Sequence, residues 1–169
     1  MRTLLKLRTK NNTVFDGSVK GNPVKLRGNI SILAKENMFN IKKGYIDPGP
    51  VPDMAKCQSF TVEATILPKV VDGSRQNIIE SQLPPIALFL DYKGFVWGSV
   101  HIKGEGWKSV KSSSKLVQGK EYHVIFSRDN NSKLILEIGG NRVGEKSVNG
   151  LMDPVGKKGF LIGTAMDGK

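Results

Sequence analysis

The amino-acid sequence predicts an all-β protein, and three observations support this prediction. Apolar runs of five to eight residues, too short for helices, recur between residues 86 and 138. Turn signals separate these runs, among them residues 91–94, the serine run at residues 112–114 and residues 129–132. No segment has a sustained apolar period of 3.6 residues, which is the period of a helix. We therefore expect roughly a dozen short antiparallel strands in a two-sheet sandwich or a barrel.

The first fifty residues give weaker signals. Strand candidates lie at residues 4–7, 13–15 and 24–33. Residues 35–46 also fit a helical turn, but we interpret them as a loop that leads into a strand. Residues 47–53 contain three prolines, which lack the backbone donor of a sheet, and this predicts an extended surface loop.

The clearest strand pattern lies at residues 59–67. Phe60, Val62, Ala64 and Ile66 alternate with polar residues, so the strand has one core-facing side, and Pro68 ends it. The other strands that we expect are residues 77–81, 86–90, 95–102, 122–126 and 134–138.

Composition limits the class of protein. The length of 169 residues suits one domain, residues 1–169, and the 38% hydrophobic and 24% charged content is that of a soluble globular chain. One cysteine, Cys57, allows no intrachain disulfide. The N-terminal apolar stretch is interrupted by Lys6 and Arg8, so it predicts neither a signal peptide nor an anchor, although an export signal can precede a piece of a longer protein.

The formal net charge of +11 favours acidic partners such as nucleic acid, anionic polysaccharide or a membrane surface. The alternative is that the positive charge serves only to keep the protein soluble. Neither an arginine-rich helix nor an aromatic RNA-binding signature is present, so nucleic acid is disfavoured, and membrane insertion is not expected.

Five segments in order resemble the laminin G-like branch of the concanavalin A-like lectin/glucanase superfamily. They are SFTVEATILP, QNIIES, IALFLDYKGFVWGSV, LVQGKEYHVIFSRDNNSKLILEIGGNRVGE and GFLIGTAMDGK. The resemblance covers about residues 58–169 and implies an antiparallel two-sheet jelly-roll sandwich of the concanavalin A type.

The sequence departs from the family pattern at several positions. Glu121 and Tyr122 precede His123 where the family commonly has tryptophan, and Gly139-Gly140 replaces the common Asp-Gly turn. The family usually adds a further strand after the Ile-Gly segment. We expect residues 4–7 or 13–15 to take its place, or the chain to be part of a longer protein.

Catalytic signals are weak. The resembling fold hosts retaining glycosidases that use two close carboxylates, but here the acidic residues are single and lie on separate segments. They are Glu63, Glu80, Asp91, Asp129 and Glu137. Only His101 and His123 are available as bases, without a Gly-x-Ser-x-Gly motif. We therefore expect no enzyme and no catalytic residues.

No cofactor or metal site is predicted. The resemblance leaves Ca²⁺ possible, because laminin G-like domains often bind it with carboxylates and carbonyls at a sandwich rim. Asp91, Asp129 and Asp167 lie in loops where they can contribute, but each also fits the role of a turn residue that bonds its own backbone.

The hairpin between residues 95 and 112 is the best candidate for ligand binding. Alternation places Phe95, Trp97, Ser99 and His101 on one side, opposite an apolar side that looks like core. An aromatic beside polar groups suits stacking on sugars. The predicted ligand-binding residues are Trp97, His101, Lys103, Trp107, Lys108 and Lys111. The alternative places both tryptophans in the core, with lysine stems along the edges.

We interpret the chain as a non-catalytic, lectin-like module that recognises a glycan, acidic if the lysines contribute, in an extracellular or cell-surface setting. Two alternatives stay open. One is a structural or protein-protein interaction module of a larger secreted, surface or virion protein. The other is a glycosidase or lyase with an unrecognised site.

Overall fold

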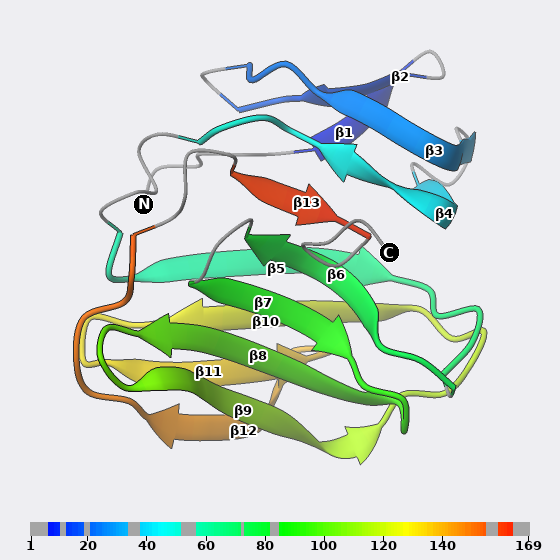
Figure 1. Cartoon of the computed structure of the whole chain (residues 1–169). Coiled ribbons are helices and arrows are strands. Elements are labelled where there is room, and N and C mark those ends of the chain that lie inside the picture. Colours follow the sequence, from blue (N-terminus) through cyan, green and yellow to red (C-terminus); the bar gives the residue numbers. More distant parts are fainter. Residues whose placement is uncertain are drawn as a thin grey trace.

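The structure, a computed structural model, is an all-β sandwich of two stacked antiparallel layers (Figure 1). It describes residues 7–10, 13–18, 21–33, 38–51, 57–71, 73–81, 85–154 and 159–163. Within these ranges it contains no helix long and apolar enough to cross a membrane. The predicted fold class is confirmed.

Thirteen strands are described, and their bounds follow. They are β1 (Leu7–Lys10), β2 (Thr13–Asp16), β3 (Lys25–Leu33), β4 (Met38–Asp47), β5 (Phe60–Ile66), β6 (Gln76–Ser81), β7 (Ile86–Leu90), β8 (Phe95–Ile102), β9 (Gly106–Lys115), β10 (Tyr122–Arg128), β11 (Lys133–Ile138), β12 (Asn141–Ser147) and β13 (Phe160–Ile162).

The strands form three sheets. The first layer is a seven-stranded sheet in the order β3-β4-β13-β6-β7-β8-β9, and the second is a four-stranded sheet in the order β12-β11-β10-β5. Figure 1 shows the second layer behind β6 to β9, while β3 and β4 extend beyond it. β1 and β2 pair with each other in a separate two-stranded sheet.

Three sequence-based expectations for the N-terminal part are wrong. Residues 38–47 form a full strand, β4, because they pair with β3 along its whole length. Residues 47–53 are not purely a surface loop, since Pro48 is fully buried and Val51 belongs to the core. β4 of the β3–β4 hairpin lies beside β13, whereas residues 13–15 belong to β2 and pair with β1. Of the other candidate, residues 4–7, residues 4–6 lie outside the described residues.

The run of serines at residues 112–114 is also not a turn, because it lies inside β9. The hydroxyl of Ser112 accepts a hydrogen bond from the backbone N–H of Val96 and donates one to the carbonyl of Ser114. These bonds accommodate a register irregularity between β8 and β9. The hairpin therefore continues to Lys115.

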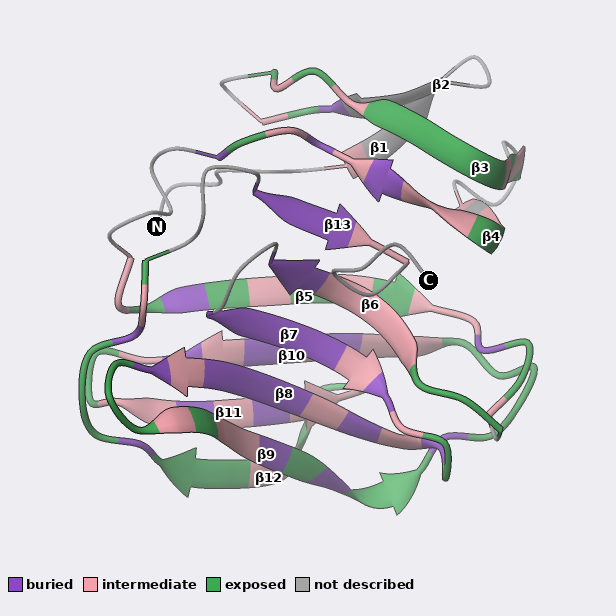
Figure 2. Ribbon diagram, in the orientation of Figure 1, coloured by how far each residue is buried: buried purple, intermediate pink, exposed green. Residues whose placement is uncertain are grey.

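The core lies between the two layers, where β7 and β8 face β10 and β11. Burial is concentrated along β7, β8 and β10, whereas β3 and β12 are largely exposed (Figure 2). Phe126 on β10 packs edge-to-face on Phe60, with ring centroids 5.3 Å apart. Gly98 on β8 lies directly against the ring of Phe126, where a Cβ atom would overlap it. The absence of a side chain at residue 98 thus lets the sheets close.

One charged side chain is buried at the end of the sandwich. Arg128 is 3% exposed, and its guanidinium donates to the carbonyls of Gln58, Val148 and Gly150 and to the Ser132 hydroxyl, over 2.6 to 3.3 Å. Burial lowers the pKa of Arg128, and the charge of Asp129 partly offsets this. Arg128 thereby ties three loops to β10.

We expect Arg128→Ala to lower the free energy of unfolding by about 3 kcal/mol or more, because it leaves buried carbonyl oxygens without a donor. Urea denaturation measures this loss. Arg142→Ala is the matched control: Arg142 is 54% exposed on the same sheet, and its ion pairs are solvated, so its loss should stay below about 1 kcal/mol. Similar losses for both arginines would contradict the structural role of Arg128.

We expect Gly98→Ala to cost about 2 kcal/mol, since the added methyl group forces the ring of Phe126 to move in a packed core. Thermal unfolding followed by circular dichroism checks this value. Phe126→Leu made in the Gly98→Ala background should recover part of the loss, because the smaller side chain leaves room for the methyl group. If the two losses simply add, the proposed clash is not the cause.

Candidate ligand-binding surface

The outer face of β8 and β9 is the side turned away from the four-stranded sheet. Val96, Val100 and Ile102 of β8 are fully buried between the sheets, so the residues that alternate with them point outward. Three successive cross-strand pairs lie on this outer face. They are Trp97 with Lys111, Ser99 with Ser109, and His101 with Trp107.

The first pair continues across the neighbouring strands. Phe89 of β7 lies opposite Trp97, and the two rings are nearly parallel, with centroids 6.4 Å apart and an interplanar angle of 2°. The Arg75 guanidinium lies 3.8 Å from the centroid of Phe89, and the Lys111 ammonium lies 3.8 Å from the centroid of Phe95 and 5.3 Å from that of Trp97. Cations thus flank the aromatic rings on both sides.

Asp91, in the turn between β7 and β8, fixes the orientation of the indole. Its Oδ2 accepts the indole N–H of Trp97 at 2.9 Å, while Oδ1 accepts the backbone N–H groups of Lys93 and Phe95. Desolvation by burial raises the pKa of Asp91, but the hydrogen bond from Trp97, those from the backbone and the charge of Lys111 together lower it below its ordinary value. The carboxylate is therefore ionised at neutral pH and committed to the turn and to Trp97.

These side chains surround a depression of about 460 Å³ on the outer face. It is lined by Arg75, Phe89, Asp91, Tyr92, Lys93, Trp97, Ser109 and Lys111. Three of the lining side chains are cationic, and the one carboxylate is held by internal hydrogen bonds. An anionic group attached to a flat or apolar body has complementary chemistry to such a surface.

His101 and Trp107 form a second group on the same face. Their rings meet edge-to-face with centroids 5.4 Å apart, and Trp107 is 46% exposed. His101 Nδ1 lies 2.5 Å from an Oδ2 oxygen of Asp153. Neither Trp97 nor Trp107 belongs to the core cluster, so the alternative that places both tryptophans between the sheets does not hold.

The structure brings four of the six predicted ligand-binding residues together: Trp97, His101, Trp107 and Lys111. Lys103 follows β8 as an exposed residue of the turn, where its backbone N–H donates to the carbonyl of Leu151. Lys108 lies opposite Val100, whose side chain is in the core, so it points to the other side of β9 and pairs with Glu105 at 3.1 Å. The structure thus separates Lys108 from the outer face.

Sequence reasoning missed the part of this surface that comes from β6 and β7. Phe89 follows the same alternation as Trp97, with Ile86, Leu88 and Leu90 buried on the opposite side, so its outward direction was readable. Arg75 precedes β6 and gave no local signal, because its position depends on the pairing of β6 with β7.

The acidic residues considered for catalysis or calcium lie apart. Glu63 is on the four-stranded sheet, where it pairs with His123 at 2.7 Å, whereas Glu80 is on β6 of the other sheet, near Arg75 at 3.3 Å. Asp129, like Asp91, accepts backbone N–H groups within its own turn, and Asp167 lies outside the described residues. Among the side chains that the structure describes, no three His, Cys, Asp or Glu residues gather as a metal site would require.

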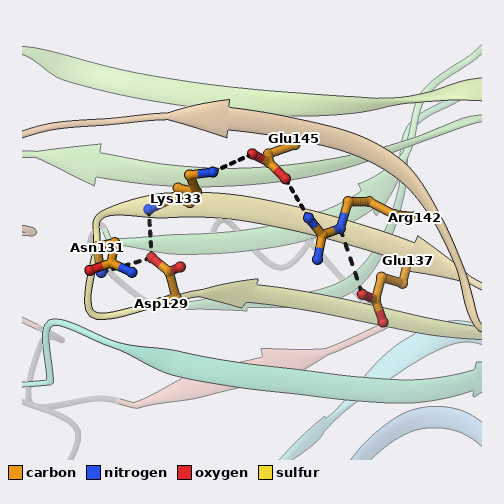
Figure 3. Close-up of polar contacts among 6 residues, drawn as sticks. All are labelled: Asp129, Asn131, Lys133, Glu137, Arg142 and Glu145. Carbon is orange, nitrogen blue, oxygen red and sulfur yellow. Dashed lines mark hydrogen bonds and ion pairs between the residues drawn. The ribbon is translucent and has the colours of Figure 1, made fainter.

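The outer face of the four-stranded sheet has a different character. Glu145 on β12 accepts from Lys133 at 2.8 Å and pairs with Arg142, which also lies 4.0 Å from Glu137 (Figure 3). The hydrogen bonds from Lys133 and Arg142 lower the pKa of Glu145, and the bond to Glu145 raises the pKa of Lys133. Positive charges on this face are matched by carboxylates, so it offers little net attraction to an anion.

Several solved structures share the fold at low sequence identity. The binding domain of botulinum neurotoxin DC in complex with SialylT is 16% identical with a TM-score of 0.77, and the match covers 94% of this chain and 42% of that chain. The receptor binding domain of the botulinum neurotoxin C/D mosaic serotype is 17% identical with a TM-score of 0.73, covering 95% and 42%. The binding domain of botulinum neurotoxin DC in complex with rat synaptotagmin II is 14% identical with a TM-score of 0.71, covering 96% and 49%.

At these identities the likeness shows the fold alone, and the chain spans less than half of each of these structures. A comparison with curated protein sequences finds no match. The family comparison is more direct: a laminin G model, described as the concanavalin A-like lectin/glucanases superfamily, matches residues 42–169. This range includes both sheets of the sandwich apart from β3 and the start of β4. The chain therefore belongs to the laminin G-like branch of the concanavalin A-like lectin/glucanase superfamily.

Proposed function

We propose that this protein is a non-catalytic, lectin-like module that binds an acidic glycan on the outer face of β7, β8 and β9. The observation that carries the proposal is the group formed by Phe89, Trp97, Arg75 and Lys111. Its two aromatic rings are parallel, its indole is fixed by Asp91, and cations stand at both ends. Sugar rings present apolar C–H faces to aromatic side chains, and a carboxylate or sulfate on the sugar is attracted by the cations.

Fixed geometry supports a binding role. Because Asp91 holds the indole, Trp97 loses little side-chain freedom when a ligand arrives, and the entropic cost of binding is correspondingly smaller. The depression is open, and its mostly apolar lining includes charged side chains, which suits the apolar face of a sugar ring that carries a charged group. An extracellular or surface setting follows from this proposal, since glycans of this kind are displayed there.

A protein partner is the second candidate. Tyr92 is 59% exposed at the rim of the depression, and Trp107 is 46% exposed near the other end of β8. Exposed aromatic residues are enriched at protein interfaces. One structurally similar binding domain is described in complex with rat synaptotagmin II. Acidic proteins are therefore the alternative ligands that the experiment below has to separate from glycans.

We expect Trp97→Ala to weaken binding to immobilised acidic glycans on the order of tenfold, because it removes the aromatic surface. Lys111→Ala should weaken binding severalfold and reduce its dependence on salt, since it removes one cation. Surface plasmon resonance on heparin, hyaluronan and sialylated glycans measures both effects, and thermal unfolding checks that each variant is folded.

Lys108→Ala is the matched control. It removes one lysine from the same strand, three residues from Lys111, but on the side of β9 that faces away from the depression. Its binding should equal that of the wild type. If folded wild-type protein binds none of these glycans, or if Lys108→Ala and Lys111→Ala weaken binding equally, the proposed site is wrong. Turnover of any of these polysaccharides would instead favour an enzyme.

A further inference from the structure

The outer face carries two aromatic positions at a fixed separation, and their spacing bears on the size of the ligand. The first subsite is the group of Arg75, Phe89, Trp97 and Lys111, and the second is the pair His101 and Trp107. The Ser99/Ser109 pair lies between them, so the subsites are two cross-strand pairs apart. With a rise of about 3.4 Å per residue and about 4.8 Å between strands, Trp97 and Trp107 are separated by roughly 14 Å.

The face between the subsites carries only small side chains in the described cross-strand pairs, and Ser99 and Ala87 are 5% and 2% exposed. Ser99 and Ser109 join their hydroxyl groups at 2.8 Å, and Ala87 lies beside Ser99 on β7. These side chains are small, whereas Trp97 and Trp107 stand on either side of them. The depression reaches this middle position, since Ser109 is part of its lining. No large side chain of the described cross-strand pairs thus separates one subsite from the other.

The two subsites differ in charge. The first has three cations around its rings, Arg75, Lys93 and Lys111, against two carboxylates: Asp91 is committed to internal hydrogen bonds, and Glu80 pairs with Arg75 at 3.3 Å. In the second, the carboxylate of Asp153 lies against His101, and Lys108 on the other side of the strand is matched by Glu105, so this subsite has no comparable excess of lysine or arginine among these side chains. A charged sugar is favoured at the first subsite, while the exposed indole of Trp107 offers a stacking surface to a sugar of either kind.

We propose that the ligand is an extended acidic oligosaccharide of several units that spans both subsites, rather than a single terminal acidic sugar. Its carboxylate or sulfate lies at the cations of the first subsite, and a sugar ring further along the chain stacks on Trp107. This inference rests on the proposed function and adds the length and direction of the ligand.

The second subsite is held in place by long-range contacts. Asp153 reaches His101 because residues 151–153 run alongside the end of β8, where Ile102 and Met152 form a bridge and the backbone N–H of Asp153 donates to the carbonyl of His101. Gln58 holds Met152 from the other side through hydrogen bonds at 2.7 and 3.3 Å. Both rings of the second subsite are therefore positioned before a ligand arrives.

Size-defined fragments of one polymer test the inference. Binding of hyaluronan disaccharide and hexasaccharide, and of the corresponding heparin fragments, is measured by isothermal titration calorimetry on wild-type protein, Trp107→Ala and Lys111→Ala. We expect wild-type protein to bind the hexasaccharide of at least one polymer roughly tenfold more tightly than the disaccharide. Trp107→Ala should lose most of this advantage while its affinity for the disaccharide stays unchanged, and Lys111→Ala should weaken both fragments.

The outcomes separate the two proposals. A longer fragment also gains affinity because it offers more binding registers, and this statistical gain persists in Trp107→Ala. Only the part of the length advantage that Trp107→Ala removes therefore supports the two-subsite inference. If the length advantage is the same in wild type and Trp107→Ala, the two-subsite inference is wrong and the proposed function still stands. If wild-type protein binds neither fragment of either polymer, both fail. Trp107 is 46% exposed, so its substitution should leave the fold intact, and thermal unfolding verifies this.

Discussion

The pairing register of β7, β8 and β9 is the constraint on which the rest of this structure depends. Side chains alternate strictly between the two faces of a sheet, so a slip of one residue would exchange every inward and outward position. In the observed register Val96 and Val100 close the core, and Trp97 lies between Phe89 and Lys111 on the outer face. The same pairing that buries the aliphatic residues therefore assembles the ligand-binding surface, and neither can change without the other.

Two contacts hold this register from opposite sides of the sheet. On the inner side, only a residue without a side chain fits against the ring of Phe126, so Gly98 has to lie at this position when the sheets pack together. On the outer side, Asp91 caps the β7–β8 turn with backbone hydrogen bonds and also fixes the indole of Trp97. A carboxylate that closes a turn is ordinary. Here the second carboxylate oxygen of Asp91 also accepts the indole N–H of Trp97 and so fixes the orientation of that ring.

The sequence predicted the parts of the fold and the site that depend on local pattern. The two-residue period of β8 assigned Trp97 to the outer face, and the turn signals separated the central strands. The sequence could not predict those parts of the site that depend on how the strands pair. Arg75 reaches Phe89 only through a β6–β7 register that shifts between Asn77 and Ile79. Lys108 is adjacent to Trp107 in sequence, and for that reason it lies on the opposite side of the strand. Asp153, 52 residues from its histidine partner, could not be found from spacing.

The net charge of +11 is distributed unequally between the outer faces of the two sheets. On the four-stranded sheet, Lys133 and Arg142 are paired with carboxylates, so that face attracts an anion weakly. On the seven-stranded sheet, Lys111 stands over aromatic rings, and Arg75 stands over Phe89 while it also pairs with Glu80 at 3.3 Å. The nearby carboxylate of Asp91 is held by an indole and by the backbone. A general excess of lysine for solubility would not favour one face over the other. A single cation, Lys120, lies 5.5 Å from the Tyr122 ring of the four-stranded sheet, whereas the described part of the seven-stranded sheet gathers Arg75, Lys93 and Lys111 around two parallel rings. Attraction of an acidic ligand to a defined surface requires such a local concentration of cations.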